Sequence, residues 1–131
     1  MTAVASVLSL SRQGVVIEFY YHEVDREILV IRADGGLNAD TADAFIEQLE
    51  SLIAAGLNRI IIDCTKLDYI SSYGVGVLLR LHKKLKKYGG DVKIAAVKSI
   101  VLKALTILRM GSIFDVYDNV DRARLAFRKT S

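Results

Sequence analysis

The feature that most constrains the fold is the regular alternation of short β-rich runs with helical segments between residues 59 and 129. Each β-rich run is apolar and β-branched, and each following segment repeats its apolar residues at helical spacing. The predicted strands are residues 59–63, 92–97 and 113–117, and the predicted helices are residues 72–88, 99–109 and 120–129. Alternation at this spacing predicts a mostly parallel sheet covered by helices.

The first half of the chain predicts a hairpin and one covering helix. Residues 15–21 and 27–33 read as two strands, and the polar residues 22–26 between them suit an antiparallel connection. Gly35 and Gly36 are predicted to end the second strand. A helix capped by Asn38 or Asp40 is then expected to run until Gly56 stops it. Residues 1–14 show no sustained periodicity, and we expect them to form a flexible N-terminal arm.

Length and composition fit one domain. The chain has 131 residues, of which 52% are hydrophobic and 25% charged, so it can bury an ordinary core but leaves no room for a second domain. The sequence thus predicts an α/β fold made of a single domain, residues 15–131. Its mixed, mostly parallel sheet is expected to have about four to five strands and about four helices, with the N-terminal hairpin at one side.

Composition also argues against several classes of protein. Charged residues interrupt every apolar run before membrane-spanning length, and no leader pattern opens the chain, so we expect a cytoplasmic protein without direct membrane insertion. A single cysteine, Cys64, and two widely spaced histidines do not form a metal-binding pattern. The net charge of +3 comes without a basic run interleaved with aromatic residues, so no nucleic-acid partner is expected.

Two serines stand at the predicted junction between a β-rich run and a helix. The isoleucines at positions 60–62 read as a buried strand, and helical spacing begins at Val75, which leaves Ser71 and Ser72 at an accessible helix start. Free N–H groups and a partial positive charge at such a start would favour a phosphate on Ser72. The alternative is that Ser72 only caps the helix, a role worth about 1 kcal/mol.

This junction resembles the phosphorylation segment of the STAS family, specifically of the bacterial anti-sigma-factor antagonists. The motif here is Ser71-Ser72-Tyr73-Gly74-Val75-Gly76, and the resemblance covers roughly Val15 to Lys129, including Gly35-Gly36-Leu37-Asn38 and Asp63. Two departures from the family pattern concern the choice of partner. Asn38 stands where many relatives have Asp, and Ser71 and Tyr73 replace the commoner Asp and small residue.

The resemblance implies a phosphorylation-controlled switch protein in bacterial transcription regulation, such as a stress response. Unphosphorylated at Ser72, it would bind an anti-sigma factor that is also a serine kinase, and a metal-dependent serine phosphatase would reverse the modification. Ser71 is expected to be a plain helix cap or a supporting hydroxyl, and it is the second choice for the phosphorylated residue. ATP and Mg²⁺ would serve the partner kinase, so no cofactor of this chain is expected, and a weak homodimer is left open. The alternative is a STAS scaffold or a regulatory subunit of a signalling complex or membrane transporter.

A helical wheel through the segment after Ser72 predicts the partner surface. It directs Val75, Leu78 and His82 towards the sheet. It directs Tyr73, Gly76 and Val77 outward, on the same side as a basic stripe made of Arg80, Lys83, Lys84 and Lys87. The basic residues are either a solvated face or part of the contact. The expected partner-binding residues are those that the wheel and the resemblance place near Ser72: Asn38, Ser71, Tyr73, Gly74, Gly76, Val77 and Arg80. Asp63 is expected to support this site.

No enzyme motif accompanies the serines. A hydrolase nucleophile elbow needs glycine two residues before its serine, and Ile70 occupies that position here. Leu79 replaces the third glycine of a dinucleotide fingerprint, and no Gly-Lys-Ser/Thr phosphate loop exists. Chain order permits a triad of Ser72, Asp63 and a histidine, but the wheel directs His82 into the core. We therefore expect a protein that is not an enzyme and has no catalytic residues.

Overall fold

The computed structural model describes residues 6–12, 15–107 and 113–129. The strands are β1 Ser6–Arg12, β2 Val15–Tyr21, β3 Leu29–Leu37, β4 Arg59–Asp63, β5 Leu67–Ile70, β6 Asp91–Ala95 and β7 Asp115–Tyr117. The helices are α1 Ala39–Ala54, α2 Ser72–Lys87, α3 Ser99–Ile107 and α4 Val120–Lys129. The predicted single α/β domain with an N-terminal hairpin is confirmed.

The sheet is mixed and mostly parallel. Its strand order is β1-β2-β3-β4-β6-β7, and β5 pairs with the end of β3 beyond the end of β4. The β1–β2 and β2–β3 pairs are antiparallel, whereas β4, β5, β6 and β7 pair in parallel with their neighbours. Parallel strands point their carboxyl ends to one edge of the sheet, and α1 and α2 both begin at that edge.

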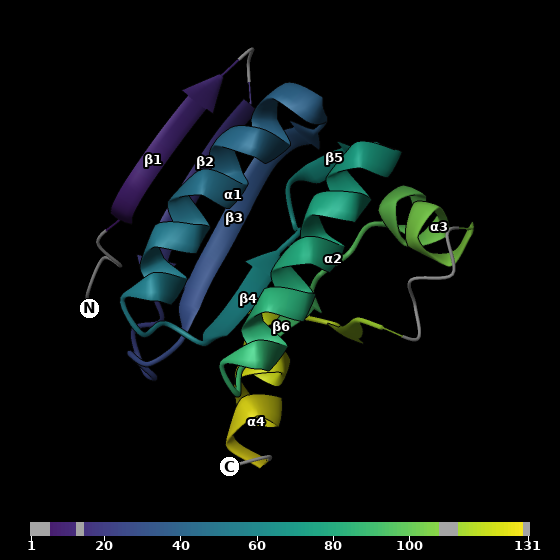
Figure 1. Ribbon diagram of the computed structural model, residues 1–131. Coiled ribbons are helices and arrows are strands. Elements are labelled where there is room, and N and C mark those ends of the chain that lie inside the picture. The colour runs from purple at the N-terminus through teal and green to yellow at the C-terminus, as the bar shows by residue number, and fades with distance from the viewer. Residues whose placement is uncertain (1–5, 13–14, 108–112, 130–131) are drawn as a thin grey trace.

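The helices divide between the two faces of the sheet. Figure 1 shows α1 and α2 side by side on one face, α4 on the other, and α3 beyond β5. The run Ile60–Ile62 explains why both faces need cover: Ile60 and Ile62 belong to the core under α1 and α2, while Ile61 belongs to the smaller core under α4. An apolar strand of this kind is typical of a sheet that is buried on both sides.

The structure corrects the N-terminal prediction over residues 6–12, and the rest of the predicted arm, residues 1–5 and 13–14, lies outside the described residues. Residues 6–12 form β1, which pairs along β2. A short serine-rich segment has weak strand propensity by itself, so its structure comes from the free backbone groups at the edge of β2. The domain therefore includes this strand.

Two further differences concern the segment that leads to the serines. The prediction that Gly35 and Gly36 end a strand is wrong, because β3 continues to Leu37. The strand continues there because β5, which the sequence analysis missed, supplies a partner: Gly36 lies opposite Tyr69 and Leu37 opposite Ile70. The other helices and strands match the prediction within a few residues; Arg109 and Gly111, at the predicted end of α3, lie outside the described residues.

Candidate functional site

The end of β3 holds the start of α2 in place. The N–H of Ser71 donates to the carbonyl oxygen of Leu37 at 2.9 Å, so the chain enters α2 tied to β3. Gly74 lies over the same residue: a Cβ at this position would lie 2.8 Å from that oxygen and 2.9 Å from Cγ1 of Ile70. Gly74 is buried, and its role is to let the first turn of α2 approach β3 rather than to contact a partner directly.

The two serines have different environments. Ser71 is the N-cap of α2, and its Oγ accepts a hydrogen bond from the N–H of Gly74 at 3.0 Å, which confirms its predicted role as a cap. Ser72 is the first residue of α2, and its side chain is exposed. Its hydroxyl makes no hydrogen bond to any other described residue. The structure thus gives the capping role to Ser71 and leaves the hydroxyl of Ser72 accessible.

The helix start is electrostatically suited to an anion on Ser72. The N–H groups of Gly74 and Val75 already bond to Ser71, through its side chain and its carbonyl oxygen, so those of Ser72 and Tyr73 are the ones that the cap leaves unused. The first turn of α2 carries no acidic residue, and no charged residue of α2 precedes Arg80. A phosphate on Ser72 would therefore meet the positive end of α2 without a repelling carboxylate on that helix.

The Asn38 loop lies beside this helix start, as the family resemblance implied. Asn38 directly follows Leu37, the residue to which Ser71 is bonded, and it caps α1. Its Oδ1 accepts from the N–H of Thr41 at 3.2 Å, and its own N–H donates to Oγ1 of Thr41 at 3.0 Å. This reciprocal cap fixes the loop next to the serines. Contact of Asn38 with a partner stays a prediction.

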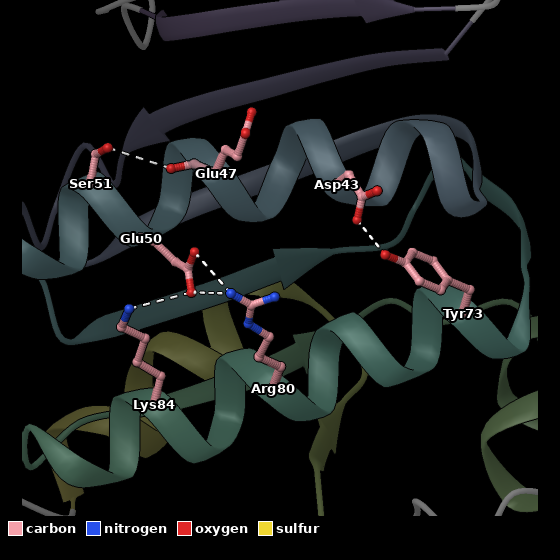
Figure 2. Close-up of polar contacts among 7 residues, drawn as sticks. All are labelled: Asp43, Glu47, Glu50, Ser51, Tyr73, Arg80 and Lys84. Carbon is pink, nitrogen blue, oxygen red and sulfur yellow. Dashed lines mark hydrogen bonds and ion pairs between the residues drawn. The ribbon is translucent and has the colours of Figure 1, made fainter.

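Polar side chains cross the seam between α1 and α2, as Figure 2 shows. At one end, the hydroxyl of Tyr73 donates to a carboxylate oxygen of Asp43 at 2.5 Å, and this hydrogen bond raises the pKa of Tyr73. At the other end, Glu50 receives Arg80 at 3.0 Å and Lys84 at 3.3 Å. Tyr73 remains about half exposed, so its ring forms part of the surface next to Ser72.

The predicted exposure is wrong for Val77 and right for Gly76. Val77 is only 6% exposed and packs in the main core, because α1 lies against this side of α2 and widens the buried stripe beyond the part that faces the sheet. A helical wheel shows directions but not the presence of a second helix. Gly76 is exposed and has open space around its Cα, so it leaves the surface between Ser72 and Arg80 flat.

Asp63 and His82 lie apart from the serine hydroxyls. Asp63 is buried, and Oδ1 accepts from the N–H of Thr65 at 3.0 Å and from its hydroxyl at 2.5 Å. Because side chains alternate along β4, Asp63 is on the α4 face of the sheet, as Ile61 is, and it stabilises the turn that leads to β5. His82 is partly buried, with its ring edge-on to Phe114 and Nε2 3.7 Å from Asp91.

Sequence reasoning missed three residues of this surface. Tyr69 is half exposed on β5 and covers Gly36, where a Cβ would lie 2.9 Å from the tyrosine ring. Asp43 and Glu50 orient Tyr73 and Arg80 from α1. Tyr69 and Ile70 are residue types that favour strands and were a signal for the short strand β5, but no local pattern pairs a residue of α1 with one of α2.

The described parts of the chain have neither a candidate metal cluster nor a candidate membrane-spanning helix. No group of three or more His, Cys, Asp or Glu side chains there could hold a metal ion. Among the helices of the described residues, none has the length and apolar character needed to cross a membrane.

The fold and the serine junction together define a class: an α/β domain in which a capped, serine-bearing start of α2 is bound to the end of β3. The family model described as STAS domain matches residues 22–123. The chain belongs to the STAS domain family. The family that the serine motif suggested is therefore confirmed.

Named relatives agree with this assignment. The chain is 30% identical over 101 residues to BtrV of Bordetella bronchiseptica, a candidate anti-sigma factor antagonist. The alignment covers 77% of this chain and 87% of BtrV. It is 28% identical over 104 residues to the anti-sigma F factor antagonist of Paenibacillus polymyxa, covering 79% of this chain and 86% of the relative.

A solved structure confirms the fold independently. The anti-sigma factor antagonist SpoIIAA, in its unphosphorylated form, superimposes with a TM-score of 0.74 at 23% identity, over 85% of this chain and 96% of that one. The Bacillus protein SpoIIAA has also been solved in a phosphorylated form. At this identity the likeness establishes the STAS fold of the present chain.

Proposed function

We propose that this chain is an anti-sigma factor antagonist, a non-catalytic cytoplasmic protein that changes partners when Ser72 is phosphorylated. The single observation that carries the proposal is the accessible hydroxyl of Ser72 at the positive end of α2, next to a serine that already serves as the cap. Relatives named as anti-sigma factor antagonists support it. Unphosphorylated, the chain would bind an anti-sigma factor and release the sigma factor that it holds.

The anti-sigma factor in this proposal is also the kinase that modifies Ser72. Oγ of Ser72 attacks the γ-phosphorus of ATP, the new O–P bond forms as the bond to the ADP oxygen breaks, and a base of the kinase takes the hydroxyl proton. ATP and Mg²⁺ bind to the kinase, and this chain needs no cofactor. A metal-dependent serine phosphatase restores the hydroxyl by hydrolysis.

The physical effect of the phosphate lies at the interface. It adds about 1.5 to 2 negative charges, which the start of α2 tolerates, so the fold should persist. A contact built around the neutral hydroxyl of Ser72, the ring of Tyr73 and the flat surface at Gly76 would have to remove water from that dianion. The cost is several kcal/mol, and about 1.4 kcal/mol is a tenfold loss of affinity. A single phosphate is therefore enough to release the partner.

The test is phosphorylation by a candidate kinase encoded beside this chain, with ATP and Mg²⁺, and location of the phosphate by mass spectrometry. We expect phosphate on Ser72, none on Ser72→Ala, and continued modification of Ser71→Ala. Ser72→Asp should keep the circular dichroism spectrum of the wild type and lose binding to the kinase. If Ser72→Asp binds as tightly as the wild type, the switch mechanism is wrong.

Size-exclusion chromatography separates the proposed switch protein from the alternative, a scaffold or a transporter subunit. A switch protein should elute from a size-exclusion column as a monomer or weak dimer, whereas a scaffold subunit should elute as a large particle. Absence of phosphate on Ser72 with a kinase that is active on another substrate, together with a large particle, would favour the scaffold.

A further inference from the structure

The charge distribution along α2 is one-sided. The helix contains no Asp or Glu, and all of its Lys and Arg residues lie in its second half: Arg80, Lys83, Lys84, Lys86 and Lys87. An ordinary solvated helix mixes both signs of charge, because oppositely charged neighbours stabilise one another.

The favourable interaction of cations with a helix C-terminus explains only part of this pattern. That effect is confined to the last turn, which contains Lys84, Lys86 and Lys87. Lys86 also pairs with Asp91 at 3.6 Å, and Lys84 pairs with Glu50. No described carboxylate lies within ion-pair distance of Lys83 or Lys87. Two exposed cations on this helix are therefore left without a counterion from the described residues.

These two lysines lie on the same face as Ser72. At 100° per residue, the following side chains lie within about 60° of one another around α2: Ser72, Gly76, Lys83 and Lys87. Ser72 and Lys87 are about 22 Å apart along the axis at 1.5 Å per residue, a length that one protein partner can cover. A partner that approaches Ser72 along α2 therefore meets Lys83 and Lys87.

A groove marks the basic end of this face. It has a volume of about 540 Å³ and is lined by Glu50, Arg80, Lys83, Lys84, Lys87 and Tyr88. Glu50 supplies the one carboxylate of the lining and is already engaged by Arg80 and Lys84, so the groove keeps a clear excess of positive charge. It can receive a side chain or short segment of negative charge.

We propose that this basic groove, together with Lys83 and Lys87, is an electrostatic docking surface for an acidic segment of the protein that phosphorylates Ser72. The inference rests on the proposed function and adds the chemistry of the partner. The docking surface acts before and independently of the modification, since its cations begin two turns away from Ser72. It accelerates association and aligns the partner along α2.

The neighbouring helix favours a protein segment over an extended polyanion. α1 carries two exposed acidic residues, and Figure 2 shows Asp43 pointing towards α2 and Glu47 pointing away from it. A nucleic-acid duplex or an anionic membrane would lie over both helices and meet these carboxylates. A protein partner can place its acidic residues along the α2 face alone.

The experiment compares two doubly substituted proteins of equal net charge. Lys83→Glu/Lys87→Glu reverses the docking surface, and Arg26→Glu/Arg122→Glu reverses two exposed cations in the β2–β3 turn and on α4, away from the groove. Phosphorylation kinetics with the candidate kinase are measured at about 50 mM and about 500 mM NaCl, because salt screens surface charges. Lys83→Gln/Lys87→Gln provides a version without new negative charge.

We expect the docking variant to raise KM about tenfold or more at low salt with kcat unchanged, and to lose most of this defect at high salt. The glutamine variant should show a smaller rise of KM, and the control variant should match the wild type. Two results would overturn the proposal. One is an equal defect in both charge-reversed proteins. The other is a KM of the docking variant within about twofold of the wild type at low salt, since steering raises on-rates at least about tenfold.

A second measurement does not depend on the kinase. Fluorescence anisotropy follows binding of a labelled poly-glutamate peptide to the wild type and to both doubly substituted proteins. Selective loss in the docking variant supports the acidic docking surface even if Ser72 is never phosphorylated, in which case the proposed function alone fails. Equal peptide binding by all three proteins, or selective loss of binding to duplex DNA or phosphatidylserine vesicles instead, contradicts it.

Discussion

Alanine at Gly74 and alanine at Gly76 should change the stability of this domain in opposite directions. Both glycines lie in the first two turns of α2, and in both cases alanine gains about 0.5–1 kcal/mol from helix propensity. At Gly76 the new methyl group meets open space, so this gain is kept. At Gly74 the methyl would lie 2.8 Å from the Leu37 carbonyl oxygen, too close for unstrained contact.

The cost at Gly74 exceeds the gain. The Leu37 oxygen belongs to β3 and is held by the N–H of Ser71, so it cannot move aside as the end of a flexible side chain would. Overpacking of this kind costs about 1–3 kcal/mol. We therefore expect Gly74→Ala to destabilise the domain by about 1–2 kcal/mol and Gly76→Ala to stabilise it by about 0.5–1 kcal/mol.

Urea unfolding followed by circular dichroism measures both variants against the wild type. The expected gap of about 2 kcal/mol corresponds to a more than tenfold difference in the unfolding equilibrium and is larger than the error of linear extrapolation when the slopes agree. If both alanine variants are stabilised alike, α2 does not approach β3 as closely as described. The explanation of how Ser71 and Ser72 are positioned would then be refuted.

Three further predictions follow from local contacts. Ser71→Ala should lower the unfolding free energy by about 1 kcal/mol and Ser72→Ala should change it by less than about 0.5 kcal/mol, because only the hydroxyl of Ser71 caps α2. Thermal unfolding of both variants checks these values, and equal losses of stability would contradict the assignment of the cap to Ser71. In urea unfolding, Gly90→Ala should cost more stability than Gly89→Ala, since a Cβ at Gly90 would lie 1.9 Å from a backbone oxygen. A Cβ at Gly89 would meet open space, so that substitution carries only the cost of the positive φ, about 1–2 kcal/mol. The reverse order would refute the close contact at Gly90. Burial raises the pKa of the Cys64 thiol to about 12, so above the ordinary thiol pKa the unfolded chain releases this proton and the folded chain does not. The free energy of unfolding should therefore fall as pH rises from about 8.5. The difference in urea midpoint between wild type and Cys64→Ala, compared between about pH 8 and pH 10, measures this fall, and a difference that does not change with pH would contradict it.

Local sequence patterns determined much of the path to the candidate site. Three consecutive isoleucines ended by Asp63 predicted a strand at residues 59–63, which is β4, and helical spacing from Val75 predicted a helix from Ser72, which is α2. These patterns suffice because an apolar strand and an amphipathic helix are encoded in neighbouring residues. The strand-to-helix junction and the capping role of Ser71 could therefore be predicted, as could the family through its motif.

Contacts between distant segments account for the differences. β1 and β5 form where β2 and β3 offer unpaired backbone groups. Val77 is buried because α1 lies against α2, and Tyr73 is held by Asp43, thirty residues earlier in the chain.

The sequence by itself determined the elements, the class of fold and the two serines, since these depend on residues close together in the chain. Only the tertiary structure decided which of the surrounding side chains are exposed and which cations of α2 have no carboxylate partner among the described residues. Burial and ion pairing depend on which elements pack against one another, and that choice is made by the whole chain.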